Sequence, residues 1–200
     1  MKVEFLYDFG SPNAYFAHRV IPQIEARTGV KFTYVPILLG GVFKATNNKS
    51  PVVQFAEIKN KLAYERLEID RFIKKHALTK FRWNSNFPVN TLTIMRGAVA
   101  AEMDGVAAPY IEAMFRGMWE EGSKLDRPSV IVETLNEAGL DGERLAARTQ
   151  DQTVKDALVA NTEKAVARGT FGAPTFFVDG EIYFGKDRLH DVEEAIVAGK

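Results

Sequence analysis

Strand-like segments occur only near the two ends of this chain of 200 residues, and helical patterns occupy the part between them. Near the N-terminus, apolar and aromatic residues run from Val3 to Phe9 and again from Val30 to Leu39. Gly10 ends the first run and Gly40-Gly41 ends the second. Between the runs, apolar residues recur at helical spacing as far as Gly29. A strand, a helix and a second strand of these lengths are typical of a parallel βαβ unit.

The C-terminal end of the chain returns to strand patterns. Thr175–Val178 and Glu181–Phe184 flank Asp179-Gly180, and an Asp-Gly pair in this position is a strong signal for a tight hairpin turn. Asp187–Ala198 then has the pattern of a closing helix. This end of the chain is therefore predicted to be a ββα unit.

The middle of the chain has helical patterns throughout. The segments that we predict to be helices are Val53–His76, Thr91–Met103, Ala107–Trp119, Pro128–Ala138, Asp141–Arg148 and Asp151–Arg168. The first of these is expected to be one helix with an apolar face that includes Ile58, Leu62 and Phe72.

These patterns together predict an α/β protein with a thioredoxin-like core (βαβ, then ββα). The core consists of residues 1–41 and 169–200, and a large all-helical insertion domain of residues 42–168 separates its two parts. The antiparallel hairpin distinguishes this arrangement from half of a Rossmann fold.

Composition excludes several classes of function. The chain contains no cysteine, so it forms no disulfide and carries out no dithiol exchange. Its formal net charge is zero, which argues against binding to nucleic acid or to an anionic membrane. The acidic residues near the N-terminus and the lack of a long apolar run indicate a soluble, cytoplasmic protein. His18, His76 and His190 lack metal-ligand spacing, and we interpret them as surface or helix-end residues with no metal site.

The turn between the first strand and the first helix is the place where a thioredoxin-like core carries its reactive residue. Ser11 to Ala14 occupy this place, with serine and alanine where redox members have their two cysteines. Free amides and the positive end of the helix dipole favour a thiolate there, and the Ser11 hydroxyl is able to donate a hydrogen bond to the sulfur of a ligand. The local spacing equally fits a serine that only caps the helix. We interpret Asp8 as a structural partner of the turn.

A second candidate element is the segment from Thr170 to Phe176, which lies opposite the Ser11 loop in this type of fold. Pro174 directly precedes the third strand, where proline is ordinary. The fold context favours a cis Ala173–Pro174 bond. Such a bond would turn the backbone of Ala173 outward, so that it is able to pair with an extended peptide.

Three segments in this order resemble the glutathione-dependent kappa-class transferases and the bacterial 2-hydroxychromene-2-carboxylate isomerases, within the DsbA-like group. The resemblance runs from end to end of the chain. The segments that carry it are Tyr7 to Tyr15, Phe87 to Asn90 followed by Arg96, and Thr170 to Phe176 followed by Phe184 to Leu189.

The resemblance implies that glutathione is the cofactor and that Ser11, as the catalytic residue, hydrogen-bonds its sulfur. Ala173, before Pro174, would pair with the cysteinyl backbone of glutathione. The γ-glutamyl end would be held by Phe184, Gly185, Lys186 and Asp187. Asp187 would meet the ammonium group. The chain departs from the family at Lys186, where glutamine or asparagine is frequent, and at Glu68, where aspartate is frequent.

The resemblance also implies a substrate side of the pocket. Lys44 and Asn48 match positions that line the substrate or the glycyl end, and Trp83 and Asn90 match pocket residues of the insertion. Without the resemblance, we would interpret Lys44 as a solvent-exposed residue and Trp83 as a core residue.

The function that the resemblance implies is the isomerisation of 2-hydroxychromene-2-carboxylate or a related intermediate of aromatic-compound degradation. Glutathione would act as a transient nucleophile and would be regenerated. Two alternatives remain open. The first is a kappa-like transferase that conjugates small electrophiles and consumes glutathione, and the second is a non-catalytic DsbA-like protein that binds peptides. The partners expected are glutathione, a small aromatic substrate and, from the resemblance, a second copy in a homodimer.

Overall fold

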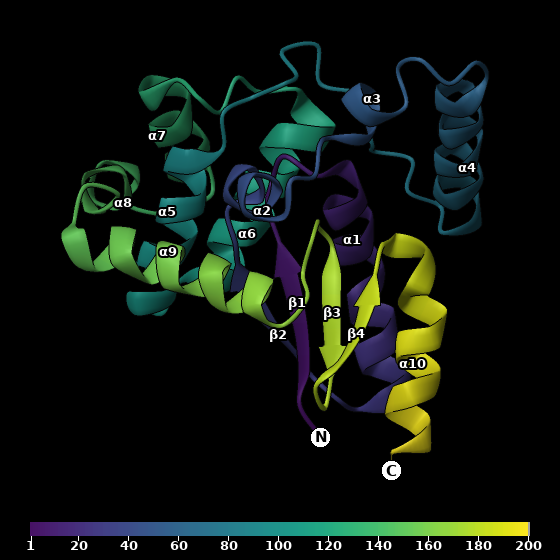
Figure 1. The fold of residues 1–200 in the computed structure, drawn as a ribbon. Helices are drawn as coiled ribbons and strands as arrows, with labels where there is room; N and C mark the ends of the chain where they lie inside the picture. Colours follow the sequence, from purple (N-terminus) through teal and green to yellow (C-terminus); the bar gives the residue numbers. More distant parts are fainter. Residues whose placement is uncertain (200) are drawn as a thin grey trace.

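A four-stranded mixed sheet forms the centre of the computed structural model, which describes residues 1–199 (Figure 1). The strand order is β2-β1-β3-β4. The strands are β1 (Val3–Tyr7), β2 (Phe32–Pro36), β3 (Thr175–Val178) and β4 (Glu181–Phe184). β1 runs parallel to β2 and antiparallel to β3, and β3 and β4 form an antiparallel hairpin. The βαβ and ββα units and the thioredoxin-like core are thereby confirmed.

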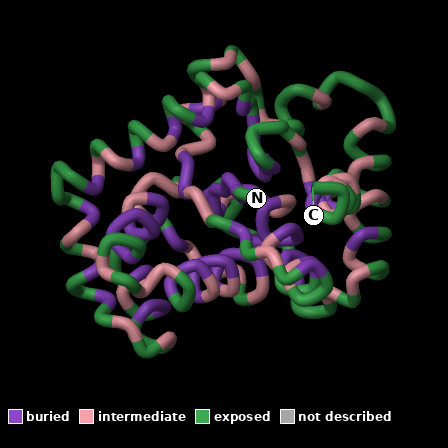
Figure 2. The backbone as a smooth tube through the Cα atoms, turned by 90° about the horizontal axis from the view of Figure 1, so that it is seen from below, coloured by how far each residue is buried: buried purple, intermediate pink, exposed green. Residues whose placement is uncertain are grey.

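Both faces of the sheet are covered, because successive side chains of a strand point to opposite faces. On one face, Val3, Phe5 and Tyr7 join the main core, to which α1 (Pro12–Thr28) and α10 (Leu189–Ala198) contribute. On the other face, Leu6 packs with Ala165 of α9 (Gln152–Ala167) in a smaller cluster. Figure 2 shows buried residues concentrated in the middle of the molecule and exposed residues along its outer edge.

The insertion is helical, as the sequence predicts. Its helices are α2 (Leu39–Thr46), α3 (Pro51–Gln54), α4 (Lys61–Lys75), α5 (Leu92–Met103), α6 (Ala107–Arg116), α7 (Pro128–Glu137) and α8 (Gly142–Arg148), followed by α9. A π-helical turn, Gly117–Glu121, extends α6, and a short 3-10 turn, Lys186–Arg188, precedes α10. No helix within residues 1–199 combines the length and the apolar character needed to cross a bilayer.

Two predictions at the start of the insertion are wrong. Gly40 and Gly41 do not end a strand; they lie in the first turn of α2, which begins at Leu39. The reason is a close approach between helices, since a Cβ on Gly41 would lie 3.3 Å from Thr162 Cγ2 of α9. Gly41 therefore serves packing, whereas a Cβ on Gly40 would meet nothing within 4 Å.

The single helix expected over Val53–His76 is also wrong, because the structure has two helices there. α3 ends at Gln54, and α4 begins after Asn60, whose φ of 70° lies in the left-handed region. Of the apolar residues of α4, only Phe72 is buried. Ile69 and Ile73 are partly buried against the core, whereas Leu62 and Leu67 are exposed. α4 stands apart from the sheet (Figure 1).

A cluster of ionisable side chains connects α1 to α6 and to the turn that follows it. His18 lies within this cluster, so the prediction that it is a surface or helix-end residue is wrong. Arg19 forms ion pairs with Glu112, at 2.8 Å, and with Glu120, at 2.5 Å. The two ring nitrogens of His18 lie 2.9 Å from the Tyr34 hydroxyl and 3.1 Å from the Glu112 carboxylate. Burial lowers the pKa of His18, so the ring is neutral. We therefore assign the tautomer in which Nε2–H donates to Glu112 and Nδ1 accepts from Tyr34.

The pKa of His18 leads to a prediction for the pH dependence of stability. Below the usual imidazole pKa of about 6.5, His18 is protonated in the unfolded chain. In the folded chain its pKa is lower, so His18 stays neutral until the pH falls further. The stability that neutral His18 contributes is present above this pH and is lost as the pH falls through it toward the lower folded pKa. We expect the free energy of unfolding to fall between about pH 7.5 and pH 5.5, and His18→Gln to flatten that slope.

Urea unfolding at each pH measures this slope. His190→Gln is the matched control, because the His190 side chain is 74% exposed on α10. A hydrogen bond from His18 lowers the pKa of Glu112 to about 2, so this carboxylate stays ionised throughout the pH range tested. An unchanged slope in His18→Gln would assign the effect to other groups.

The contact between α5 and α6 gives a second prediction. Tyr110 donates its hydroxyl to the Ile94 carbonyl at 2.9 Å, and a Cβ on Gly97 would overlap that hydroxyl. Gly97→Ala should therefore lower the free energy of unfolding by about 1–3 kcal/mol, the usual cost of overpacking. Gly40→Ala is the control in another helix, because its Cβ would meet nothing within 4 Å. Equal stability of the two variants would contradict the packing argument.

Candidate functional site

Ser11 caps α1 and at the same time reaches across to the opposite side of the site. Its backbone is extended, with φ −94° and ψ 113°, and its hydroxyl oxygen accepts the Ala14 N–H at 3.2 Å. The hydroxyl donates to the Ala173 carbonyl at 2.9 Å. The capping role is thus confirmed. The hydroxyl proton has an acceptor within the protein, and Ser11 must exchange this acceptor to donate to a ligand.

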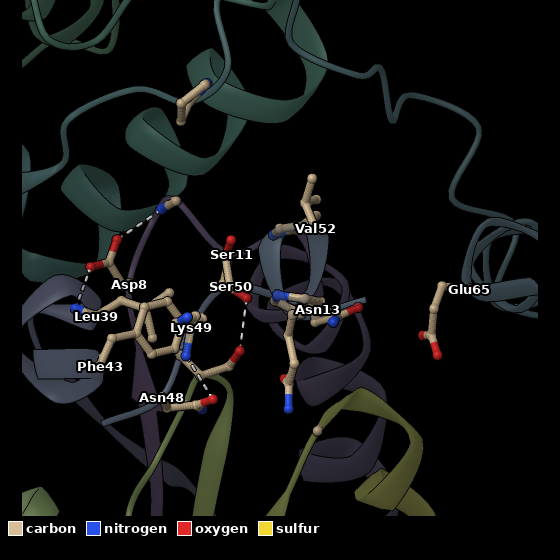
Figure 3. Close-up of a pocket in the computed structure, with 18 of the residues that line it drawn as sticks. Asp8, Ser11, Asn13, Leu39, Phe43, Asn48, Lys49, Ser50, Val52 and Glu65 are labelled. Atoms are coloured by element: carbon tan, nitrogen blue, oxygen red, sulfur yellow. Dashed lines mark hydrogen bonds between the residues drawn. The ribbon is translucent and has the colours of Figure 1, made fainter. Parts of the chain in front are cut away.

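The first turn of α1 leaves a donor free beside Ser11. Among the described residues, the Asn13 N–H has no hydrogen-bond acceptor, as is usual at the second position of a helix. The Asn13 side chain, labelled in Figure 3, lines the same cavity as Ser11, and its buried Oδ1 has no partner within residues 1–199. This end of α1 therefore offers a free amide and a positive dipole end to a ligand.

The Ala173–Pro174 peptide bond is cis, which confirms the expectation from the sequence. Within residues 1–199, the Ala173 N–H has no acceptor and remains available for pairing. The Pro174 carbonyl accepts the Gly185 N–H at 2.9 Å, so this segment is joined to the end of β4. Phe87–Pro88 is a second cis bond that the sequence analysis did not identify.

Asp8 holds the turn that carries Ser11. Its buried carboxylate accepts the N–H of Gly10 at 2.8 Å through one oxygen. Through the other it accepts the N–H of Leu39 at 2.8 Å (Figure 3) and the hydroxyl of Thr91 at 3.1 Å. Burial raises the pKa of this carboxyl, although the three hydrogen bonds act to lower it. Asp8 thereby links the Ser11 turn to the starts of α2 and α5, as a structural partner of the turn.

A cavity of about 1830 Å³ opens over Ser11. Its walls come from the start of α1, from α2 to α4, from residues 87–92 and from the two ends of the β3–β4 hairpin. Nine residues predicted from the sequence line it: Ser11, Asn48, Trp83, Asn90, Ala173, Phe184, Gly185, Lys186 and Asp187. Lys44 is exposed on α2 and is not part of the lining, and Pro174 is buried behind Ala173.

The end of the cavity beside β4 carries an ion pair. Lys186 is buried, and its ammonium donates to Asp187 Oδ1 at 2.7 Å and lies 4.9 Å from the centre of the Phe72 ring. The Asp187 side chain remains 63% exposed. Arg188, not Asp187, occupies the N-cap position of α10, so the Asp187 carboxylate is not used for capping.

Aromatic side chains form much of the exposed lining, and sequence reasoning identified only part of this wall. Trp83, Phe87, Phe171 and Phe184 are all about half exposed. The Phe171 and Phe184 rings lie 4.4 Å apart between their centres. Arg66 of α4 lies over Trp83, with its guanidinium carbon 5.6 Å from the ring centre. The sequence signal for α4 was an apolar helical face, which gave no indication that this face borders a cavity.

The chain is similar over nearly its whole length to proteins of one family. The profile of the DSBA-like thioredoxin domain matches residues 2–197. The 2-hydroxychromene-2-carboxylate isomerase of Pseudomonas putida is 26% identical over 196 residues, which cover 98% of this chain and 94% of that protein. Glutathione S-transferase kappa 1 of Caenorhabditis elegans is 23% identical over 98% of this chain and 90% of its own length. A solved structure of a 2-hydroxychromene-2-carboxylate isomerase superposes with a TM-score of 0.85 at 26% identity, covering 99% of this chain and 95% of that one.

The three hydrogen bonds of Asp8 give a prediction for the integrity of the site. Asp8→Ala leaves two partly buried N–H groups and one hydroxyl without their acceptor, so the free energy of unfolding should fall by about 2–4 kcal/mol. Asp70→Ala is the control, because it removes the same charge from an exposed position in the same cavity. Urea unfolding compares the two variants, and an equal effect of both would show that Asp8 acts only through its charge.

Proposed function

The chain belongs to the DSBA-like thioredoxin domain family, and from this premise we propose that it is a glutathione-dependent isomerase. The proposed substrate is 2-hydroxychromene-2-carboxylate or a related intermediate of aromatic-compound degradation. The observation that carries the proposal is the Ser11 hydroxyl at the N-terminus of α1, facing the backbone of Ala173, in a chain that has no cysteine of its own. The similarity to isomerases of that name supports the choice of substrate.

The groups left free around Ser11 suit a bound tripeptide thiol. The Ala173 N–H is available to pair with a peptide backbone, and the Asn13 N–H lies at the positive end of α1. The γ-glutamyl end of glutathione carries both an ammonium and a carboxylate. The Lys186–Asp187 ion pair offers one charge of each sign in the same part of the cavity, and it is therefore complementary to that zwitterion.

Bound glutathione would supply a thiolate that adds transiently to the substrate and is released unchanged. The chain's own contribution is to stabilise the charge on sulfur and to exclude water. Ser11 would exchange its acceptor from the Ala173 carbonyl to the sulfur, and the free amide and dipole of α1 would favour the ionised form. The half-exposed aromatic side chains would hold the flat substrate.

A kappa-like transferase is the second candidate, because the chain is also similar to the kappa 1 protein of Caenorhabditis elegans. It would use the same Ser11 site and consume glutathione. A non-catalytic protein that binds peptides along the Ala173 backbone is the third and weaker candidate. Loss of free thiol during turnover separates the transferase from the isomerase, and binding of extended peptides without affinity for glutathione identifies the third.

Replacing Ser11 tests the proposal directly. An ultraviolet time course follows 2-hydroxychromene-2-carboxylate with and without glutathione, and conversion should require glutathione without consuming it. Ser11→Ala should lower turnover by about 100-fold, the scale of losing one donor to a developing anion. Loss of the cap should also cost about 1 kcal/mol of stability, which urea unfolding measures separately.

Ser50→Ala is the matched control for this experiment. Ser50 lines the same cavity, and its hydroxyl makes no capping hydrogen bond at the start of α3. Its turnover should stay close to that of the unmodified protein. Turnover unchanged in Ser11→Ala would remove Ser11 from the mechanism, and conversion without glutathione would overturn the proposed cofactor.

A further inference from the structure

A second cavity lies on the other side of α2, between α2, α5 and α9. Its volume is about 440 Å³, which falls within the range of about 300–1,000 Å³ usual for sites that bind small molecules. The apolar side chains of its lining are Leu38, Ala45, Leu92, Leu158, Val159, Val166 and Ala167. Leu38 and Leu92 also line the cavity over Ser11. A hydrocarbon group in this open cavity would therefore contact apolar side chains from three helices.

Arg96 of α5 gives this cavity a positive charge without a counterion. Arg96 is half-buried, and within residues 1–199 its guanidinium makes no hydrogen bond or ion pair. The other half-buried arginines of this part of the chain all pair with carboxylates: Arg19, Arg116, Arg148 and Arg168. Among the half-buried arginines of residues 1–199, Arg96 alone has no carboxylate partner. A ligand in the cavity would offer an acceptor to its unused N–H donors.

The remaining charges in the lining favour a single negative charge on a ligand. Lys155 and Glu163 both come from α9, and neither side chain forms an ion pair within the described residues. Together with Arg96 they make two cationic side chains and one carboxylate, which is a formal charge of +1 for the lining. A guanidinium presents parallel N–H donors that match the two oxygens of a carboxylate.

We propose that this second cavity binds a small amphipathic monocarboxylate, with its carboxylate on Arg96 and its hydrocarbon part between α2 and α9. The site is separate from the Ser11 site in its charged groups, because Arg96 does not line the larger cavity. The proposal does not depend on the reaction proposed for the protein.

Titration calorimetry with octanoate tests the proposal, with octanol as the uncharged probe of the same length. Octanoate should bind more tightly than octanol. Arg96→Gln should weaken octanoate binding by at least about 10-fold, since a hydrogen-bonded ion pair is lost, and should leave octanol binding unchanged. Arg66→Gln is the matched control, because Arg66 is a cation of the larger cavity.

A second variant, at a different position of the lining, tests the proposal without changing Arg96. Ala45→Trp places a large side chain at an exposed position of the lining and should block both probes. Amide resonances of Gly41 and Thr162 should shift on addition of octanoate, since both residues line the cavity. The proposal is overturned if octanoate does not bind, if it binds no better than octanol, or if Arg66→Gln weakens binding as much as Arg96→Gln does.

Discussion

The buried carboxylate of Asp8 is the interaction on which the geometry of the site depends. It accepts hydrogen bonds from Gly10, Leu39 and Thr91, which belong to three segments far apart in the sequence. Gly10 directly precedes Ser11, and Leu39 is the first residue of α2. The position of the Ser11 hydroxyl and of two walls of the cavity is therefore set relative to one side chain. The raised pKa reflects the cost of burying this charge, and the three donors offset part of it.

The core of the fold could be predicted from the sequence because its signals are local. The Asp179-Gly180 pair specifies its own turn, with both residues at positive φ, and β3 and β4 have the predicted bounds. Ser11 and Pro12 mark the start of α1 for equally local reasons, since one side chain caps the helix and the other lacks an N–H. The nine lining residues followed from these positions together with the resemblance, not from spacing alone.

What could not be predicted depends on contacts between distant segments. Helical spacing shows that α4 has an apolar face, but not that this face borders a cavity. His18 looked like a surface residue, because Tyr34 and Glu112 come to it from β2 and α6. Gly40-Gly41 was interpreted as a break for the same reason, since the helix that approaches Gly41 lies more than a hundred residues later. Periodicity gives the direction of a side chain within its own element and no information about its neighbour.

The position of α2 between two cavities restricts how this protein is able to change over time. Leu38 and Leu92 border the space over Ser11 on one side and the smaller space beside Arg96 on the other. A substitution of either leucine that reshapes one space therefore also reshapes the other. A replacement of Leu38 or Leu92 that suits a new substrate in the cavity over Ser11 would therefore also have to preserve the smaller cavity. These two leucines should accordingly tolerate fewer replacements than residues that border one space alone.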